Sequence, residues 1–191
     1  MRVTWYTAMS MDGRIADAAN GLGFLDTIGE GHVSPAPFDD FIATVDAVVV
    51  GATTLRWLLD GGHGWPHDDL PTWLVSHDPT LGERVGATRA PLSRVEGDLS
   101  AAFAAIEAAG HAHVWLAGGG AVAAQALALD RVDDVIVTIA PTVVGAGAAL
   151  FDATDLPERR FRVLAAGHTG GDTVDVHWTR DRTPSLLRHA P

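Results

Sequence analysis

Five short, mostly apolar runs constrain this chain more than any other feature of its sequence. Each run is bounded by turn-forming or polar residues, and stretches that can form helix lie between them. A run of this length is too short for a typical globular helix, and continuous apolarity is typical of a strand covered on both faces. The sequence therefore predicts five buried strands, at Val3–Met9, Asp46–Gly51, Pro71–Ser76, His113–Ala117 and Val135–Ala140.

The clearest helix lies at Leu99–Ala109. Its apolar residues recur at helical spacing, Asp98 is a good N-cap, and Gly110 provides a stop. Three further helices are expected, at Gly120–Leu129, near Pro37–Val45 and shortly after Thr53.

Only strands are predicted towards the C-terminus, at Phe161–Ala165 and at Thr173–Thr179. In the second, the alternation predicts Val174, Val176 and Trp178 on one face. Strand–helix alternation followed by paired strands indicates an α/β fold, with a mostly parallel sheet and a C-terminal antiparallel hairpin. We expect one domain over residues 1–180 and a loose tail over residues 181–191.

The composition excludes several classes of site. The chain has 191 residues, no cysteine and no lysine, so disulfides, thiolate sites, Schiff-base amines and a Walker-type lysine are excluded. A net charge of −11 argues against nucleic-acid and anionic-membrane partners. No apolar signal core or membrane-length run is visible, so we expect a cytoplasmic protein with a small-molecule partner.

The strongest local motif is the glycine triplet in VWLAGGGAVAAQAL, residues 114–127. Three glycines between a buried strand and a helix allow backbone N–H groups to approach a phosphate at the helix N-terminus. The same glycines would also permit close packing, and the motif alone does not separate these two interpretations. Its spacing differs from the G-x-G-x-x-G of the dinucleotide-binding Rossmann fold.

Two further strand ends carry polar groups that a ligand could use. Gly51 ends the run VVVG, and Thr53 or Thr54 is predicted to cap the next helix and offer a hydroxyl to phosphate. Ser76 and His77 follow a third strand. Ligands of open α/β sheets bind at the carboxyl ends of strands, so we expect these groups to share one cleft.

Histidine pairs offer a different interpretation, a metal-dependent hydrolase. His63 and His67 are separated by Gly64 and Pro66, which disfavours a helical pair. His111 and His113 lack an evident third ligand in the sequence. We therefore expect no metal site.

Four segments in this order resemble the dihydrofolate reductase-like superfamily. They are SMDGRIA, DAVVVGATT, LAGGGAVAAQAL and VDDVIVTIAPTVVGAG, within a likeness that covers roughly residues 2–180. The nearest resemblance is to the reductase domain of bacterial riboflavin biosynthesis and its stand-alone relatives. The resemblance implies a three-layer α-β-α fold with a mixed sheet of about eight strands, NADPH as hydride donor, and a homodimer.

The resemblance also assigns cofactor-binding positions. The first two glycine turns match the family's diphosphate loops, the early residues lie near the nicotinamide, and the third strand end lies beside the adenosine 2′-phosphate. Thr138 matches a threonine on the strand after the glycine loop. The matching cofactor positions are Ala8, Ile15, Ala16, Gly51, Thr53, Thr54, Ser76, His77, Gly118, Gly119, Gly120, Val122 and Gln125.

Three alanines depart from the family pattern. Folate reductases usually carry a basic residue at the positions of Ala52 and Ala121, and riboflavin-type reductases carry Glu at the position of Ala117. NADH therefore remains an alternative to NADPH. The residues that could replace the missing cations are His77, Arg56 and Arg84.

The resemblance implies a hydride transfer to a pyrimidine-ribosylamine, as in a 5-amino-6-(5-phosphoribosylamino)uracil reductase, or to a related nitrogen heterocycle. Asp40 or Asp60 is expected to hold the water that delivers the proton, and Asp39 is a further candidate acid. Two alternatives stay open: a pterin reductase of the dihydrofolate reductase type, and a non-catalytic nucleotide-binding module.

Overall fold

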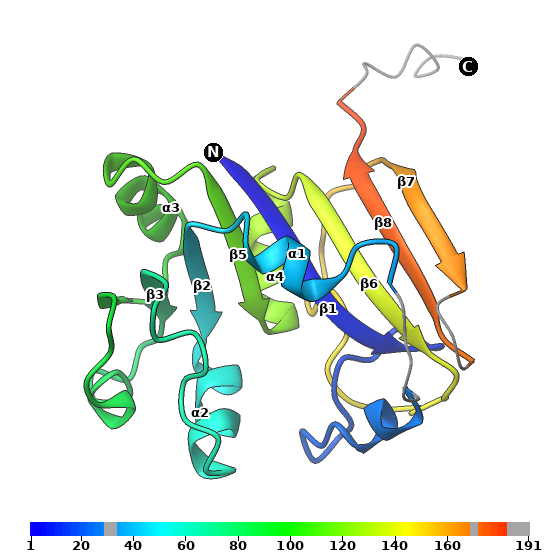
Figure 1. Cartoon of the computed structure of the whole chain (residues 1–191), viewed down its shortest axis with the longest axis horizontal. Helices are drawn as coiled ribbons and strands as arrows, with labels where there is room; N and C mark the ends of the chain where they lie inside the picture. The colour runs from blue at the N-terminus through cyan, green and yellow to red at the C-terminus, as the bar shows by residue number, and fades with distance from the viewer. Residues whose placement is uncertain (29–33, 169–171, 183–191) are drawn as a thin grey trace.

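A single mixed sheet organises the computed structural model, which describes residues 1–28, 34–168 and 172–182. Within these residues the strand order is β4-β3-β2-β5-β1-β6-β8-β7 (Figure 1). The first six strands in this order are parallel, whereas β8 pairs antiparallel with β6 and with β7. The strands are β1 Arg2–Ser10, β2 Ala47–Gly51, β3 Thr72–Val75, β4 Leu92–Val95, β5 His113–Gly118, β6 Asp134–Ala140, β7 Phe161–His168 and β8 Val174–Arg180.

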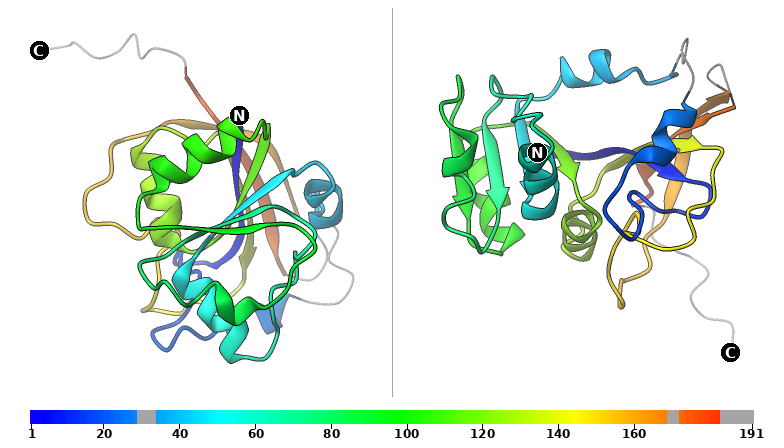
Figure 2. Two further views of the ribbon diagram at one scale, coloured as in Figure 1. Left: turned by 90° about the vertical axis from the view of Figure 1, so that its left-hand side faces the viewer. Right: turned by 90° about the horizontal axis from the view of Figure 1, so that it is seen from below.

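Helices cover both faces of this sheet. Alternate residues of β2 enter opposite cores: Ala47 and Val49 pack with α3 and α4, while Val48 and Val50 pack with α1 and α2. Figure 2 shows α1 on one side of the sheet and α4 on the other. The predicted three-layer α-β-α fold is therefore confirmed. The helices are α1 Phe38–Ile42, α2 Ala52–Asp60, α3 Leu99–Ala108 and α4 Gly120–Ala128, with 3₁₀ turns at Gly23–Thr27 and Glu83–Val85.

Most helices and strands lie where the sequence predicted them, and a few differ. Asp98 caps α3 as predicted, because its side chain accepts a hydrogen bond from Ser100 N. Helix α2 starts at Ala52 with Gly51 as N-cap, so the predicted threonine cap is wrong. Strand β4 was not predicted, since its middle residues are polar and exposed.

The last strand alternates as predicted, with Val174, Val176 and Trp178 opposite Ile139, Val137 and Val135 of β6. Val174 is 40% exposed, whereas Asp175 beside it is 1% exposed. The predicted tail, residues 181–191, lies outside the described residues apart from Asp181 and Arg182, which are held by hydrogen bonds. Within the described residues, no helix has both the length and the apolarity to cross a bilayer.

At the amino end of the sheet, side chains satisfy one another. The buried carboxylate of Asp134 accepts a hydrogen bond from Arg2 Nε at 2.6 Å and lies 3.1 Å from His177 Nε2. We call these three residues the amino-end network. Burial alone would raise the pKa of the Asp134 carboxyl, but the hydrogen bonds with His177 and Arg2 hold this pKa well below its ordinary value.

Candidate functional site

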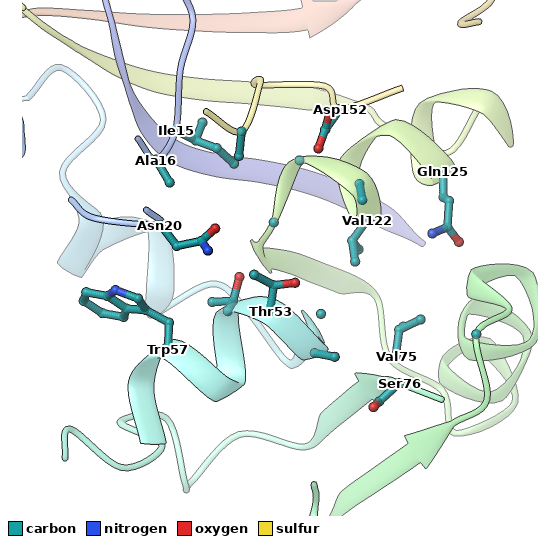
Figure 3. A pocket seen from close by; sticks show the side chains of 18 of the residues that line it. Ile15, Ala16, Asn20, Thr53, Trp57, Val75, Ser76, Val122, Gln125 and Asp152 are labelled. Carbon is teal, nitrogen blue, oxygen red and sulfur yellow. The ribbon is translucent and has the colours of Figure 1, made fainter. Parts of the chain in front are cut away.

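A cavity of about 430 Å³ lies at the opposite end of the sheet, where β2, β3 and β5 run into their following segments (Figure 3). Its volume is within the usual range for small-molecule sites. The structure brings most of the sequence-predicted cofactor residues to this cavity, while Ala8 and Gly118 do not line it. The predicted residues that line it are Ile15, Ala16, Gly51, Thr53, Thr54, Ser76, His77, Gly119, Gly120, Val122 and Gln125.

The two glycine turns are packed against each other. A Cβ atom at Gly51 would lie 2.9 Å from Val122 Cγ2 and 3.3 Å from Gly118 O. Gly118 has φ +145°, and a Cβ atom there would lie 2.5 Å from Thr54 Oγ1. The 2.9 Å contact at Gly51 and the 2.5 Å contact at Gly118 are both shorter than a Cβ atom tolerates. Close packing therefore requires glycine at both positions.

Gly119 and Gly120 differ in what they contact. A Cβ atom at Gly120 would lie 2.1 Å from Ala149 O, so packing requires glycine there as well. At Gly119 the nearest atom would be Thr54 Oγ1 at 3.4 Å, close to an ordinary contact. Gly119 lines the cavity and is the N-cap of α4, with no side-chain hydrogen bond at the cap. At this position the glycine keeps the helix terminus open to a ligand.

Helix α2 begins in the same way. Its N-cap is Gly51, again without a side-chain cap, and residues 52–54 line the cavity beside residues 119–122 of the α4 turn. The first N–H groups of a helix have no partner within the helix, and its N-terminus carries roughly half a positive charge. Two such termini at one cavity form a site suited to an anion held by main-chain groups.

The side chains of the cavity add little charge to this arrangement. Among the described lining residues, the ionisable ones are His77 and Asp152. Arg56 lies outside the lining and pairs with Asp78 at 3.1 Å. Arg84 is also outside it and pairs with Asp60 at 2.6 Å. Of the three residues that the sequence offered in place of the missing cations, only His77 reaches the cavity wall.

The acids expected to deliver a proton lie outside the lining. Asp40 is exposed on α1, and Asp60, at the end of α2, is 66% exposed. Asp39 is exposed on α1 as well.

The sequence interpretation overlooked a buried carboxylate, Asp175 on β8. It is in register with Thr138 on β6, which in turn is in register with Ala8 on β1. An acid between the apolar residues Val174 and Val176 of an alternating strand was the signal that could have identified it. The sequence interpretation also missed several lining residues, among them Asn20, Leu22, Trp57 and Asp152. Within the part of the chain that the structure describes, no group of three His, Asp or Glu residues converges as a metal site would require.

Comparison with known proteins places this architecture in a family. Residues 59–174 match the model of the RibD C-terminal domain. The uncharacterized protein YwjB of Bacillus subtilis (strain 168) is 26% identical over 185 residues, which cover 92% of this chain and 95% of YwjB.

Solved structures share the fold at low sequence identity. A riboflavin biosynthesis protein, so named, from Shewanella sp. PV-4 has a TM-score of 0.78 and 24% identity, covering 95% of this chain and 100% of its own. A pyrimidine reductase-like protein from Corynebacterium diphtheriae has a TM-score of 0.67 and 19% identity, with coverages of 95% and 92%.

A longer protein contains the same fold as one part. The Thermotoga maritima diaminohydroxyphosphoribosylaminopyrimidine deaminase/5-amino-6-(5-phosphoribosylamino)uracil reductase has a TM-score of 0.62 and 16% identity. The match covers 94% of this chain and 56% of that one, so this chain spans about half of the bifunctional protein. The family that the four ordered segments resemble is confirmed: the chain belongs to the RibD C-terminal domain family.

Proposed function

We propose that this protein is a reductase of the riboflavin-pathway type, which binds a nicotinamide dinucleotide in the cavity and reduces a pyrimidine-ribosylamine or a related nitrogen heterocycle. The observation that carries the proposal is the convergence of two uncapped helix N-termini, α2 and α4, on one cavity. Family membership supports the reductase assignment. When bound, the dihydronicotinamide would supply the hydride.

The residues of the cavity divide into three parts along its length. The first-turn amides of α2 and α4 would hold the diphosphate, and Gly119 would let it approach the backbone. Ile15, which also packs against the core, and Ala16 form an apolar end suited to the nicotinamide. Ser76 and His77 form a polar end suited to the adenosine ribose.

The source of the proton is a separate proposal. Asp40 and Asp60 are the acids that the sequence offers, and both are exposed. Asp175 joins them as a candidate, because it is buried and lies in the row of Ala8 and Thr138. Asp175→Asn should lower turnover and change its pH profile while dinucleotide affinity stays constant, and an unchanged pH profile would remove Asp175 from the reaction.

Binding is the first test, and Trp57 provides an optical signal because it lines the cavity. NADPH and NADH are titrated into the protein while tryptophan emission and heat are followed. The critical variant is Ala121→Asp, which places a carboxylate in the first turn of α4 at the cavity. A carboxylate stabilises a helix N-terminus but repels a diphosphate, so stability should hold while affinity falls about tenfold or more.

The matched control is Ala101→Asp. This residue lies in the first turn of α3, is exposed, and does not line the cavity, so affinity should not change. The absence of binding of either dinucleotide at millimolar concentration would refute the proposal. An Ala121→Asp variant with full affinity would refute the placement of the diphosphate.

Turnover is the second test. The protein is mixed with NADPH and 5-amino-6-(5-phosphoribosylamino)uracil, and the loss of reduced nicotinamide absorbance is recorded. A panel of other pyrimidines and of pterins follows, which separates the riboflavin-type from the pterin-type reductase. Ala117 stands at the position where the resemblance implies Glu, so a non-catalytic nucleotide-binding module is the second candidate function. Cofactor binding with no oxidation across the panel would favour the nucleotide-binding module.

A further inference from the structure

Two arginines lie near the polar end of the cavity, at the end of β3, without lining it, and both are already paired. Arg56 on α2 lies 3.1 Å from the Asp78 carboxylate. Arg94 on β4 donates to Ser76 O at 2.9 Å, and its guanidinium is 3.9 Å from Glu96. Among the described residues, both of these arginines are therefore close to a carboxylate.

Asp78 is fixed in place by its own turn. Its Oδ1 accepts hydrogen bonds from Thr80 N at 3.0 Å and from Thr80 Oγ1 at 2.9 Å. Its backbone N–H donates to Ser76 Oγ at 3.0 Å. Hydrogen bonds with Arg56 and Thr80 lower the pKa of the Asp78 carboxyl to about 2, so it is ionised at neutral pH.

This carboxylate stands one residue beyond His77, which lines the cavity. In Rossmann sheets, which also bind dinucleotides at the carboxyl ends of parallel strands, an acid accepts a hydrogen bond from the ribose 2′-hydroxyl, whereas an arginine accommodates a 2′-phosphate. Here Arg56 is paired with the acid, and Arg94 donates to Ser76 O. Asp78 does not line the cavity, but it directly follows His77, which does. A 2′-phosphate bound at Ser76 and His77 would therefore lie beside a turn that carries an ionised carboxylate, whereas a 2′-hydroxyl would lie beside an acceptor.

The positions of the two ends in the sheet indicate which end holds the ribose. The opposite end, at Ile15 and Ala16, lies on the segment after β1 in the middle of the sheet. The end with Ser76 and His77 lies on β3, one strand from the sheet edge. The nicotinamide ring must be shielded from water, so we place it at the middle of the sheet. The adenosine then lies at the end of β3.

We propose that the cavity selects the dinucleotide without a 2′-phosphate, NADH over NADPH, and that Asp78 sets this preference by holding Arg56. This inference rests on the proposed function, since it names which of the two dinucleotides the same cavity takes. Asp78 acts here as a specificity-determining residue, and Arg56 is the cation that it withholds.

The test compares dissociation constants of NADH and NADPH, measured by calorimetry on the full chain. The wild type should bind NADH about tenfold or more tightly than NADPH. Asp78→Asn keeps an oxygen for Thr80 but loses the charge that holds Arg56, so the preference should move about tenfold towards NADPH. Adding Arg56→Gln to Asp78→Asn should cancel this gain.

Two controls keep the result specific. Arg84→Gln removes an arginine paired outside the cavity and should leave the ratio of the two constants unchanged. Adenosine 5′-monophosphate and adenosine 2′,5′-bisphosphate test the ribose end alone and should follow the same order as the dinucleotides. Thermal unfolding of each variant shows whether it is folded.

Each outcome decides the inference. A wild type that binds both dinucleotides without preferring NADH overturns the inference and leaves the proposed function intact. A ratio unchanged by Asp78→Asn overturns the role of Asp78. If neither dinucleotide binds, the proposed function fails and the inference fails with it.

Discussion

The two ends of the sheet treat polar groups in opposite ways. At the amino end, Asp134 is buried between Arg2 and His177, and the three side chains satisfy one another. At the carboxyl end, the N-termini of α2 and α4 reach the cavity with no side-chain cap. The amino end is closed by its own side chains, whereas the carboxyl end leaves main-chain donors for a ligand. We expect this difference to separate side chains at the amino end that serve stability from main-chain groups at the carboxyl end that serve the proposed binding.

The largest effect on stability is expected from Asp134→Ala. Removing one partner of a buried ion pair leaves the others without compensation, and here Arg2 is half exposed, which reduces the loss. We expect the free energy of unfolding to fall by about 3 kcal/mol. Urea unfolding measures this value, and dinucleotide affinity of the folded variant should stay at the wild-type level. A loss of affinity without a loss of stability would contradict the division between the two ends.

The same carboxylate predicts a dependence on pH. The pKa of Asp134 in the folded chain lies below its unfolded value, so its contribution to stability is present above the unfolded pKa and is lost as pH falls below about 4. Urea unfolding between pH 3 and pH 7 should show a steeper acid decline in the wild type than in Asp134→Asn. Parallel curves would show that other carboxylates dominate acid unfolding.

Gly120→Ala should have the next largest effect, at the carboxyl end. Its methyl group would lie 2.1 Å from Ala149 O, a backbone atom that cannot move aside cheaply. Overpacking of this kind costs about 2 kcal/mol. Gly23→Ala is the matched control, because its nearest contact would be Asp26 Oδ2 at 4.0 Å. Equal unfolding midpoints for the two variants would mean that Gly120 is not held by packing.

A smaller effect is expected from Thr53→Val, and it should appear in binding alone. Thr53 is exposed and lines the cavity, so its hydroxyl can reach a phosphate while valine keeps the shape. One neutral hydrogen bond corresponds to about a three- to tenfold loss of dinucleotide affinity. Calorimetry measures the loss, and thermal unfolding should give the wild-type midpoint. A shifted midpoint with unchanged affinity would assign Thr53 to the fold.

The smallest effect is expected from Asp40→Asn and Asp60→Asn. Both carboxylates are exposed and lie outside the cavity lining, so neither dinucleotide affinity nor the unfolding midpoint should change. Steady-state turnover is the sharper measurement. A fall in turnover for either variant would indicate that this acid takes part in the reaction. It would then be a better candidate than Asp175 for the source of the proton.

Local patterns predicted much of the fold. Continuous apolar runs identified the central strands, and the glycine triplet identified the turn that opens α4. Strand β4 was missed because an edge strand needs few apolar residues. The partners of Asp134 and the burial of Asp175 depend on strand order, which joins residues far apart in the chain. The spacing of residues along the sequence does not indicate which residues of different strands will pair.

The insertion of β5 between β1 and β2 has a consequence for how the chain assembles. Gly51 and Gly118 belong to segments that are distant in sequence. They come into contact only when β5 docks between β1 and β2, which precede it in the chain. Contacts with such long loops form late in folding. The cavity is thus complete only in the finished sheet. A dinucleotide that binds there would slow unfolding without speeding refolding, so retention of bound nucleotide would report directly on a correctly assembled chain.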